Sequence, residues 1–325
     1  MKEPGNIEFG ALRVFAAVAD SETLTQAAQR LGISQSAVSQ AIKQLEAQAG
    51  VELVVRRARP TQLTPSGQVL QEHAVKILAD SRRMLNEVRG ATSGAIAQLT
   101  VGMIDSFGDL AGLQFMQRTQ SLVEKLSLRT GVGTSLSEAL LYRELDLLIT
   151  SDPMEDHPEL EQHPILRDPF VIILPADQQL EMSIEPAWLA QNLPFIHYTK
   201  SSRIGALTDL FARRLDLILK VRYELDSTQT LLRFVQSGQG WAMIPALCLA
   251  RYPELLKGVS IKPLGNGGNA RYLSLLSHNG ELGELPANMT TLCRQICDEE
   301  LIPPLVRLAP WLESQLHTIT ELPPI

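Results

Sequence analysis

Hydrophobic positions in the first part of the chain recur every three or four residues, a spacing that predicts helices. A first stripe covers residues 9–18. A second run ends at Gly32, and Thr23 or Thr25 can cap its start. A third run follows Ser34, with apolar residues at i, i+1, i+4, i+5 and i+8. The pattern predicts three short helices, the last two separated by a glycine turn.

A different pattern follows Gly50. Residues 51–67, VELVVRRARPTQLTPSG, place a basic turn between two short apolar runs, which predicts a two-stranded wing. From Ser66 to Arg89 the apolar spacings alternate between four and three, as in a heptad repeat. This seam predicts either a coiled coil with a second copy or a helix packed on a neighbouring domain. Its dimerisation candidates are Leu70, Ala74, Ile77, Met84 and Val88.

Beyond Gln98, continuous apolar runs alternate with amphipathic stretches, which predicts an α/β domain with parallel sheets. Residues 91–98 are small and contain Gly and Ser, so they are expected to form a hinge. The last residues, 303–325, contain several prolines and are expected to be a tail that either packs on the first lobe of the α/β domain or lies disordered. The strand candidates are residues 99–104, 145–150, 169–175, 240–246 and 272–277, and the helix candidates include 228–238 and 289–301.

The charge is distributed unevenly. The whole chain has a formal charge of −7. Residues 1–90 carry eleven Lys and Arg against nine Asp and Glu, whereas the rest carries eighteen against twenty-seven. The overall charge therefore does not exclude a nucleic-acid partner for the N-terminal part. With no long apolar run, no signal segment and only three cysteines, we expect a cytoplasmic protein without membrane association or a disulfide framework.

The third predicted helix turns amides, hydroxyls and one amine away from its apolar stripe. Gln hydrogen-bonds adenine, Ser several bases and Lys guanine, while a helix N-terminus can bind a phosphate. With the preceding helix and glycine turn, this pattern predicts a helix-turn-helix that contacts DNA. The alternative is a small helical bundle whose polar face is simply solvated. The DNA-binding candidates are Ser34, Gln35, Ser36, Ser39, Gln40 and Lys43 on the helix, and Arg56, Arg57 and Arg59 on the wing.

These motifs resemble those of the LysR-type transcriptional regulators of bacteria. The matching positions are Leu12 and Phe15, then Thr25-Gln26-Ala27-Ala28 with Leu31, Ser34 to Ser39 with Ile42, Leu45 and Glu46, Gly50-Val51 with Leu53 and Arg56, and Leu63-Thr64 with Gly67. One departure is Val54, where the family usually has Phe, and we expect it to affect packing only.

The resemblance implies the organisation of the whole chain. It implies an all-α winged helix-turn-helix and long linker helix, followed by a two-lobed α/β effector domain like a periplasmic solute-binding protein. The expected segments are a DNA-binding domain (1–66), a linker and dimerisation helix with a hinge (67–91), lobe one (92–168 and 267–302), lobe two (169–266) and the tail (303–325). The chain is expected to cross between the lobes near Arg167–Asp168 and to return near Gly265–Asn269.

The resemblance also implies a transcriptional regulator that binds promoter DNA as a dimer or tetramer and is switched by a small molecule held between the lobes. RNA polymerase stays open as a further partner. In open α/β sheets, ligands bind beyond the carboxyl ends of the strands, and hydroxyls at helix N-termini suit a carboxylate. The effector-binding candidates are Ser106, Thr134, Ser135, Ser151, Thr199, Ser201, Ser202, Arg203, Ser227 and Thr228.

Several features weigh against that assignment or leave it open. Each Ser or Thr, taken singly, is more often a helix cap. Asp105 and Asp152 would disfavour an anion, or would bind an amine. His197 and Tyr198 either line the site or pack in the core.

Other chemistries have little support in the sequence. No Ser-His-Asp spacing or carboxylate pair indicates catalysis, so no catalytic residue, cofactor or metal is expected. Cys293 and Cys297 lie four residues apart, but no nearby His or acid completes a metal site. A redox role for Cys248 would need a partner in space. The alternative function is a small-molecule-binding or enzymatic α/β module with an N-terminal protein-interaction bundle, which would lack steep salt dependence.

Overall fold

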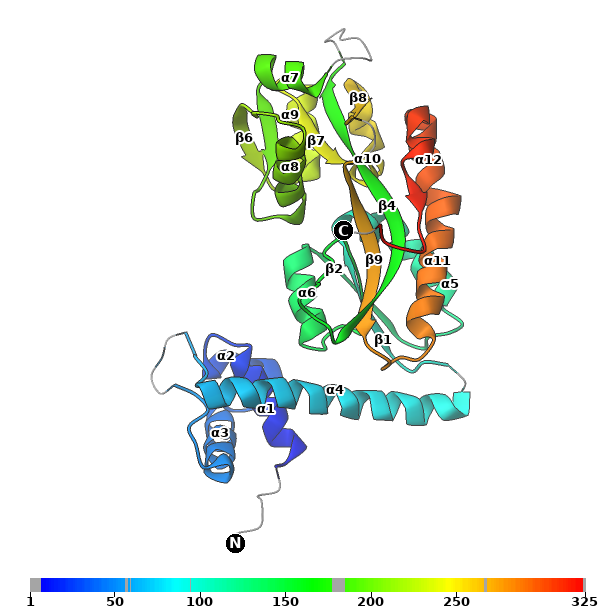
Figure 1. The fold of residues 1–325 in the computed structure, drawn as a ribbon. Coiled ribbons are helices and arrows are strands. Elements are labelled where there is room, and N and C mark those ends of the chain that lie inside the picture. The colour runs from blue at the N-terminus through cyan, green and yellow to red at the C-terminus, as the bar shows by residue number, and fades with distance from the viewer. Residues whose placement is uncertain are drawn as a thin grey trace. The chain divides into compact units, whose positions relative to one another are not determined.

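The computed structural model describes residues 7–55, 58, 60–93, 95–176, 185–265 and 268–323. The chain forms two compact units, one built from residues up to Ala97 and the other from most of the chain after it (Figure 1). Within the described residues, no helix is both long enough and apolar enough to cross a membrane.

The N-terminal unit consists of four helices around a small apolar core. Thr23 caps α2 by accepting the N–H of Gln26, and Gly32 ends it at φ 67°, a left-handed conformation that favours glycine. Phe15, Val38 and other buried side chains form the core. The helices are α1 (Phe9–Ala19), α2 (Leu24–Leu31), α3 (Gln35–Ala49) and α4 (Pro65–Ser93).

The predicted wing is present, but its strands are reduced to one antiparallel bridge between Val54 and Leu63. Val54, at the position where the family usually has Phe, is partly buried and packs against the helical core. Gly67 is required where α4 passes the wing, because a Cβ there would lie 2.1 Å from the carbonyl oxygen of Leu53. Arg56, Arg57 and Arg59 lie outside the described residues.

The heptad prediction for α4 is wrong in its first two positions. Leu70 packs against the core of its own unit and Ala74 is fully buried, because α4 packs on α1 within the same chain. Ile77, Met84 and Val88 are 42%, 57% and 65% exposed. Only this second half of the seam is free to contact another molecule. The helix also runs to Ser93, into the segment for which the sequence predicts a hinge.

Lobe one of the second unit is a mixed sheet rather than the parallel sheet predicted. Its strand order is β10-β4-β9-β3-β1-β2, in which β10 (His317–Thr318) comes from the C-terminal segment. Strand β1 is parallel to β2 and β3, and β9 is antiparallel to β3 and β4. The elements are β1 (Leu99–Ile104), α5 (Asp105–Thr119), β2 (Leu126–Gly131), α6 (Gly133–Leu141), β3 (Leu147–Thr150), β4 (Leu160–Pro175), β9 (Ala270–His278), α11 (Leu285–Ile296) and a π-helical turn, η2 (Cys297–Leu301).

Strand β4 joins the two lobes. It pairs with β9 as far as Pro169, opposite Ala270. From Phe170 onward it pairs with two strands of lobe two, β7 (Ala242–Pro245) and β8 (Val259–Pro263). In Figure 1, β4 and β9 lie side by side in the middle of this unit. The sequence pattern identified only the last part of β4 as a strand.

Lobe two is built around a core of aromatic and aliphatic side chains that includes Phe170, Phe195, Phe211 and Trp241. Phe195 and Trp241 pack edge to face, with ring centroids 4.8 Å apart. The elements are α7 (Pro186–Asn192), β5 (Phe195–Tyr198), α8 (Arg203–Arg214), β6 (Val221–Leu225), α9 (Thr228–Gln236), β7 (Ala242–Pro245), α10 (Ala246–Ala250), η1 (Pro253–Leu256) and β8 (Val259–Pro263).

The C-terminal segment, for which the sequence predicts a tail, is folded. It forms α12 (Ile302–Leu308), a 3-10 turn, η3 (Pro310–Ser314), and β10 (His317–Thr318), which adds a strand to lobe one beside β4. Of the two alternatives for this segment, packing on the α/β domain is the one observed.

Candidate functional site

Helix α3 presents the predicted polar face to solvent. Val38, Ile42 and Leu45 are buried on its inner side. Ser34 accepts the N–H of Ala37 at 3.2 Å and thereby fixes the start of the helix. The predicted DNA-binding positions on α3 are all at least partly exposed: Ser34, Gln35, Ser36, Gln40 and Lys43 are exposed, and Ser39 is half-buried.

A groove of about 1170 Å³ runs along this face. Gln35, Ser39 and Lys43 of α3 line one side of it, and the start of α2 and the wing line the rest. Glu46 also borders the groove, but its carboxylate accepts the N–H of Leu53 at 2.9 Å. This carboxylate therefore holds the base of the wing against α3. Its acceptor capacity is partly used by the protein itself.

The predicted effector-binding residues differ in exposure and in their local hydrogen bonds. Ser202 and Ser227 cap helices, with Ser202 accepting the N–H of Gly205 at 3.0 Å and Ser227 that of Thr230 at 3.4 Å. Of the remaining candidates, three are buried, Thr199 is half-buried and four are exposed. The buried ones are Ser106, Ser151 and Thr228, and the exposed ones are Thr134, Ser135, Ser201 and Arg203.

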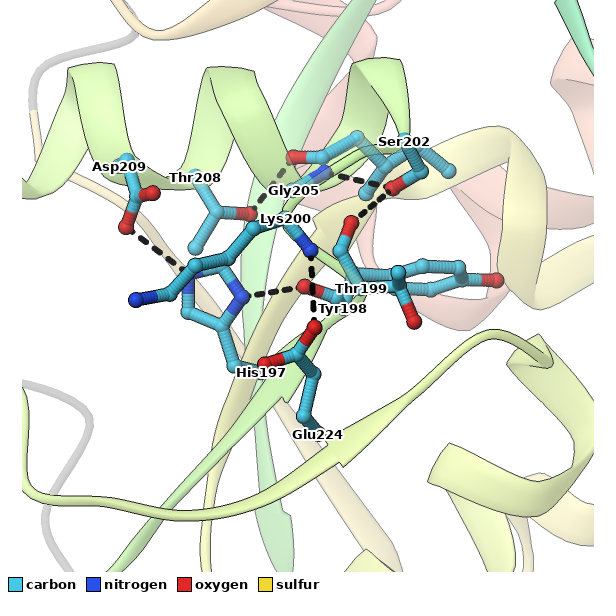
Figure 2. A network of polar contacts seen from close by, with 10 residues as sticks. His197, Tyr198, Thr199, Lys200, Ser202, Gly205, Thr208, Asp209 and Glu224 are labelled. Carbon is cyan, nitrogen blue, oxygen red and sulfur yellow. Dashed lines mark hydrogen bonds and ion pairs between the residues drawn. The ribbon is translucent and has the colours of Figure 1, made fainter.

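The turn between β5 and α8 is held by a network of polar contacts (Figure 2). Ser202 Oγ donates to the carbonyl of Thr199 at 2.7 Å while it caps α8. The N–H of Lys200 donates to the carboxylate of Glu224 at 3.2 Å. Gly205 is needed here, because a Cβ would lie 2.3 Å from the carbonyl oxygen of Thr199. The hydroxyl of Ser202 thus stabilises the turn and the start of α8.

His197 belongs to the same network and is fully buried. Its Nε2 lies 2.9 Å from Asp209 Oδ1 on α8, and its Nδ1 contacts the carbonyl oxygen of Tyr198. In Figure 2 the ring lies between these two acceptors. His197 therefore ties β5 to α8, whereas the next residue, Tyr198, hydrogen-bonds Thr228 at the start of α9.

A buried ion pair occupies the point where β4 crosses between the lobes. Arg271 Nε donates to Asp168 Oδ2 at 2.8 Å, and both side chains are at most 2% exposed. Arg271 Nη2 donates to Ser106 Oγ of lobe one at 2.9 Å. Asp168 Oδ1 accepts the N–H of Leu247 of lobe two at 3.0 Å. The pair thus contacts both lobes at once.

The electrostatics of this cluster follow from burial. Burial raises the pKa of Asp168, and the neighbouring Arg271 and the N–H of Leu247 oppose the rise. Burial likewise raises the pKa of Cys248, whose Sγ lies 4.0 Å from Arg271 Nη2, and that of Tyr198. Cys248 is therefore a neutral thiol at pH 7 rather than a reactive thiolate.

A second ion pair links the lobes. Arg251, which follows α10 in lobe two, contacts the carboxylate of Asp109 on α5 in lobe one. Its Nε is buried without a hydrogen-bond partner in the described part of the chain. Sequence periodicity did not identify Asp168, Arg271 or Arg251. Two of them left a signal nonetheless, since Asp168 follows Arg167 directly before an apolar strand and Arg271 is a single charge within an apolar run.

Two further cysteines lie on α11 and at the start of η2. Cys293 and Cys297 are buried free thiols, and burial raises the pKa of both. Across the described ranges, no group of three His, Cys, Asp or Glu side chains could hold a metal ion.

Comparison with known families accounts for both units. Residues 9–68 match the family described as "Bacterial regulatory helix-turn-helix protein, lysR family", and residues 93–295 match the "LysR substrate binding domain". The chain belongs to the LysR family. It is a LysR-type DNA-binding transcriptional regulator with a ligand-binding domain.

Curated relatives of this LysR-type chain are also regulators. The chain is 28% identical over 263 residues to the "Uncharacterized HTH-type transcriptional regulator YusT" of Bacillus subtilis, covering 79% of this chain and 85% of that protein. It is 29% identical over 248 residues to the "HTH-type transcriptional regulator BudR" of Raoultella terrigena, covering 74% and 84%.

Solved structures show the same fold at lower identity. A full-length OxyR variant from Pseudomonas aeruginosa matches with a TM-score of 0.68 at 20% identity, over 89% of this chain and 98% of that one. Full-length CbnR in complex with its target DNA matches with a TM-score of 0.60 at 19% identity, over 89% and 99%.

Proposed function

We propose that α3 of this LysR-type regulator reads promoter DNA through Gln35, Ser36, Ser39, Gln40 and Lys43. The observation that carries the proposal is the composition of this exposed face, which offers donors and acceptors for base edges. Ser34 at its N-terminus would meet a phosphate. Arg56, Arg57 and Arg59 would bind phosphates flanking the site.

Salt dependence and a matched pair of lysine variants test this proposal. The affinity of the full chain for its promoter should fall steeply with salt, because neutralised phosphates release counterions. Lys43→Ala should cost about 1–3 kcal/mol of discrimination at one base pair. Lys76→Ala, an exposed lysine on α4, is the control and should leave base preference unchanged. An equal loss on every sequence would assign Lys43 to phosphate contact instead.

We further propose that the chain acts as a homodimer through the exposed part of α4, Ile77, Met84 and Val88, with a tetramer as a higher assembly. Dimers read two half-sites about 34 Å apart, which a paired long helix would support. The proposal places the protein in the cytoplasm and gives it no enzymatic activity. RNA polymerase is a further candidate partner at the promoter.

The effector proposed is a small carboxylate held between the lobes. Ser106 supports this idea because its oxygen accepts from Arg271, which leaves its own O–H free to donate. Arg251, with its unpartnered Nε, offers a second donor and replaces the exposed Arg203 as the expected counter-charge. Binding would favour one angle between the lobes and so shift the population of DNA-bound states.

A ligand screen on the full chain tests the effector proposal. The panel contains small carboxylates, amino acids, aromatic acids and their neutral amides. A ligand at a hundred times its dissociation constant adds about 2.7 kcal/mol of stability, which a thermal shift detects. Binding should require the carboxylate and weaken in Ser106→Ala, whereas Ser237→Ala, an exposed serine after α9, should bind normally. If no compound in the panel shifts the melting temperature, or if the amides bind equally well, the effector is not a carboxylate.

A further inference from the structure

The C-terminal segment, residues 302–319, lies across the junction between the two lobes. Strand β10 pairs with β4 at Leu166 and Arg167, the last residues before Asp168. The N–H of Ile319 continues this ladder by donating to the carbonyl of Ile165 at 3.0 Å. Arg167 donates to the carbonyl of Gln315. One end of the segment is thus fastened to lobe one immediately beside the crossing point.

The other end of the segment contacts lobe two. Helix α12 packs against α10, the helix that follows β7 in lobe two. Helix α10 also contacts α5 of lobe one, where Arg251 pairs with Asp109. Figure 1 shows α12 continuing beyond α11 towards the level of α10. Helix α10 is therefore contacted by lobe-one elements and by the C-terminal segment together.

Several apolar side chains of the segment are buried as completely as those of the core. Leu305, Leu312 and Leu316 are 1%, 0% and 1% exposed. The hydroxyl of Thr318 also donates to the carboxylate of Asp298 at 3.2 Å. Residues beyond 295 lie outside the match to the LysR substrate binding domain. The contact with α10 therefore lies outside the region that the family model covers.

We propose that residues 302–319 act as a strap that restricts the angle between the lobes. The covalent links between the lobes are the chain crossings at β4 and at the start of β9, whereas this segment reaches lobe two through the packing of α12 on α10. A change of angle about those strands must slide α12 over α10, because β10 holds the strap to β4. Packed helices permit only small sliding movements before contacts are lost. The inference concerns lobe geometry, so it holds whatever the effector is.

The test measures the distance between lobes in the full chain. Spin labels are attached at Glu138→Cys on α6 and Gln229→Cys on α9, both exposed positions. The three native cysteines are buried and are not expected to label. Labelled chains are diluted with unlabelled ones, so that each oligomer carries one label pair. Pulsed electron paramagnetic resonance then gives the distribution of interlobe distances.

Two strap variants and one matched control decide the outcome. Leu305→Ala removes a buried contact of α12, and Ile319→Pro removes the N–H that bonds Ile165. Each should broaden the interlobe distribution and shift its mean. Leu308→Ala, 44% exposed on the same helix, should leave it unchanged. If both strap variants stay folded and keep the wild-type distribution, the segment only stabilises lobe one and the proposal fails. If Leu305→Ala does not fold, Ile319→Pro alone decides.

Discussion

Removing one member of the Asp168–Arg271 pair should strongly destabilise the α/β unit. Both side chains are at most 2% exposed, so water cannot compensate the charge that stays behind. Breaking a buried ion pair from one side costs about 3–5 kcal/mol. We expect Arg271→Leu to lose about that much at neutral pH, since leucine replaces part of the buried volume but not the charge.

The loss should depend on pH in a direction set by Asp168. Burial already raises the pKa of this carboxyl group, and Arg271 opposes the rise. Without Arg271 the pKa rises further, so the folded variant retains a proton that the unfolded chain releases. A carboxyl group whose pKa is higher in the folded than in the unfolded protein contributes stability at low pH. This contribution is lost as the pH rises through the pKa of the group in the folded protein. The deficit of Arg271→Leu should therefore shrink in acid.

Urea unfolding followed by tryptophan fluorescence measures this loss. All three tryptophans, Trp188, Trp241 and Trp311, lie in the α/β unit, so the signal reports that unit alone. Arg118→Leu is the matched control, because Arg118 pairs with Glu299 and Glu300 at the surface, and it should lose far less. A deficit for Arg271→Leu that is equal at neutral and acid pH would refute the reasoning, as would a wild-type midpoint.

Three further predictions concern the helices and the turn before α8. Ile77→Asp should dissociate the dimer, measured by sedimentation; an unchanged mass would show that this part of α4 packs elsewhere. Thr23→Ala should lower the stability of the N-terminal unit by about 1 kcal/mol, since it removes the cap of α2, whereas Thr25→Ala should not. Circular dichroism melts compare the two. Gly205→Ala should speed amide exchange at Ser202, because the added Cβ displaces the Thr199 carbonyl that accepts the Ser202 N–H; unchanged exchange would contradict this.

Much of the N-terminal unit was predictable because its signals are local. The apolar stripes, the cap at Ser34 and the glycine after α2 each act within a turn of helix, and the structure has them at those positions. The seam of α4 was misassigned at Leu70 and Ala74 because a heptad spacing does not distinguish a second copy from α1 of the same chain.

The α/β unit depended more on contacts between distant residues. The first part of β4, residues 160–168, carries polar residues and Pro164, so its pattern alone does not indicate a strand. It becomes one by pairing with β9, more than a hundred residues later. The serines illustrate the same limit for sites. Ser202 follows a strand and Ser227 precedes a helix, as predicted, but the hydroxyls of both cap helices, while Arg271 lies in an apolar run.

Lobe one is built from two parts of the chain, one before and one after lobe two, and this affects the order in which the protein folds. Strand β3 pairs with β9 through Thr150 and Ser274, and β10 joins the sheet only at the end of the chain. Lobe two, by contrast, is one uninterrupted stretch between β4 and β9. During synthesis, lobe two can therefore fold first. The strands of lobe one that precede it keep unpaired edges until β9 and β10 have been synthesised. Aggregation of nascent chains should begin at these unpaired strand edges.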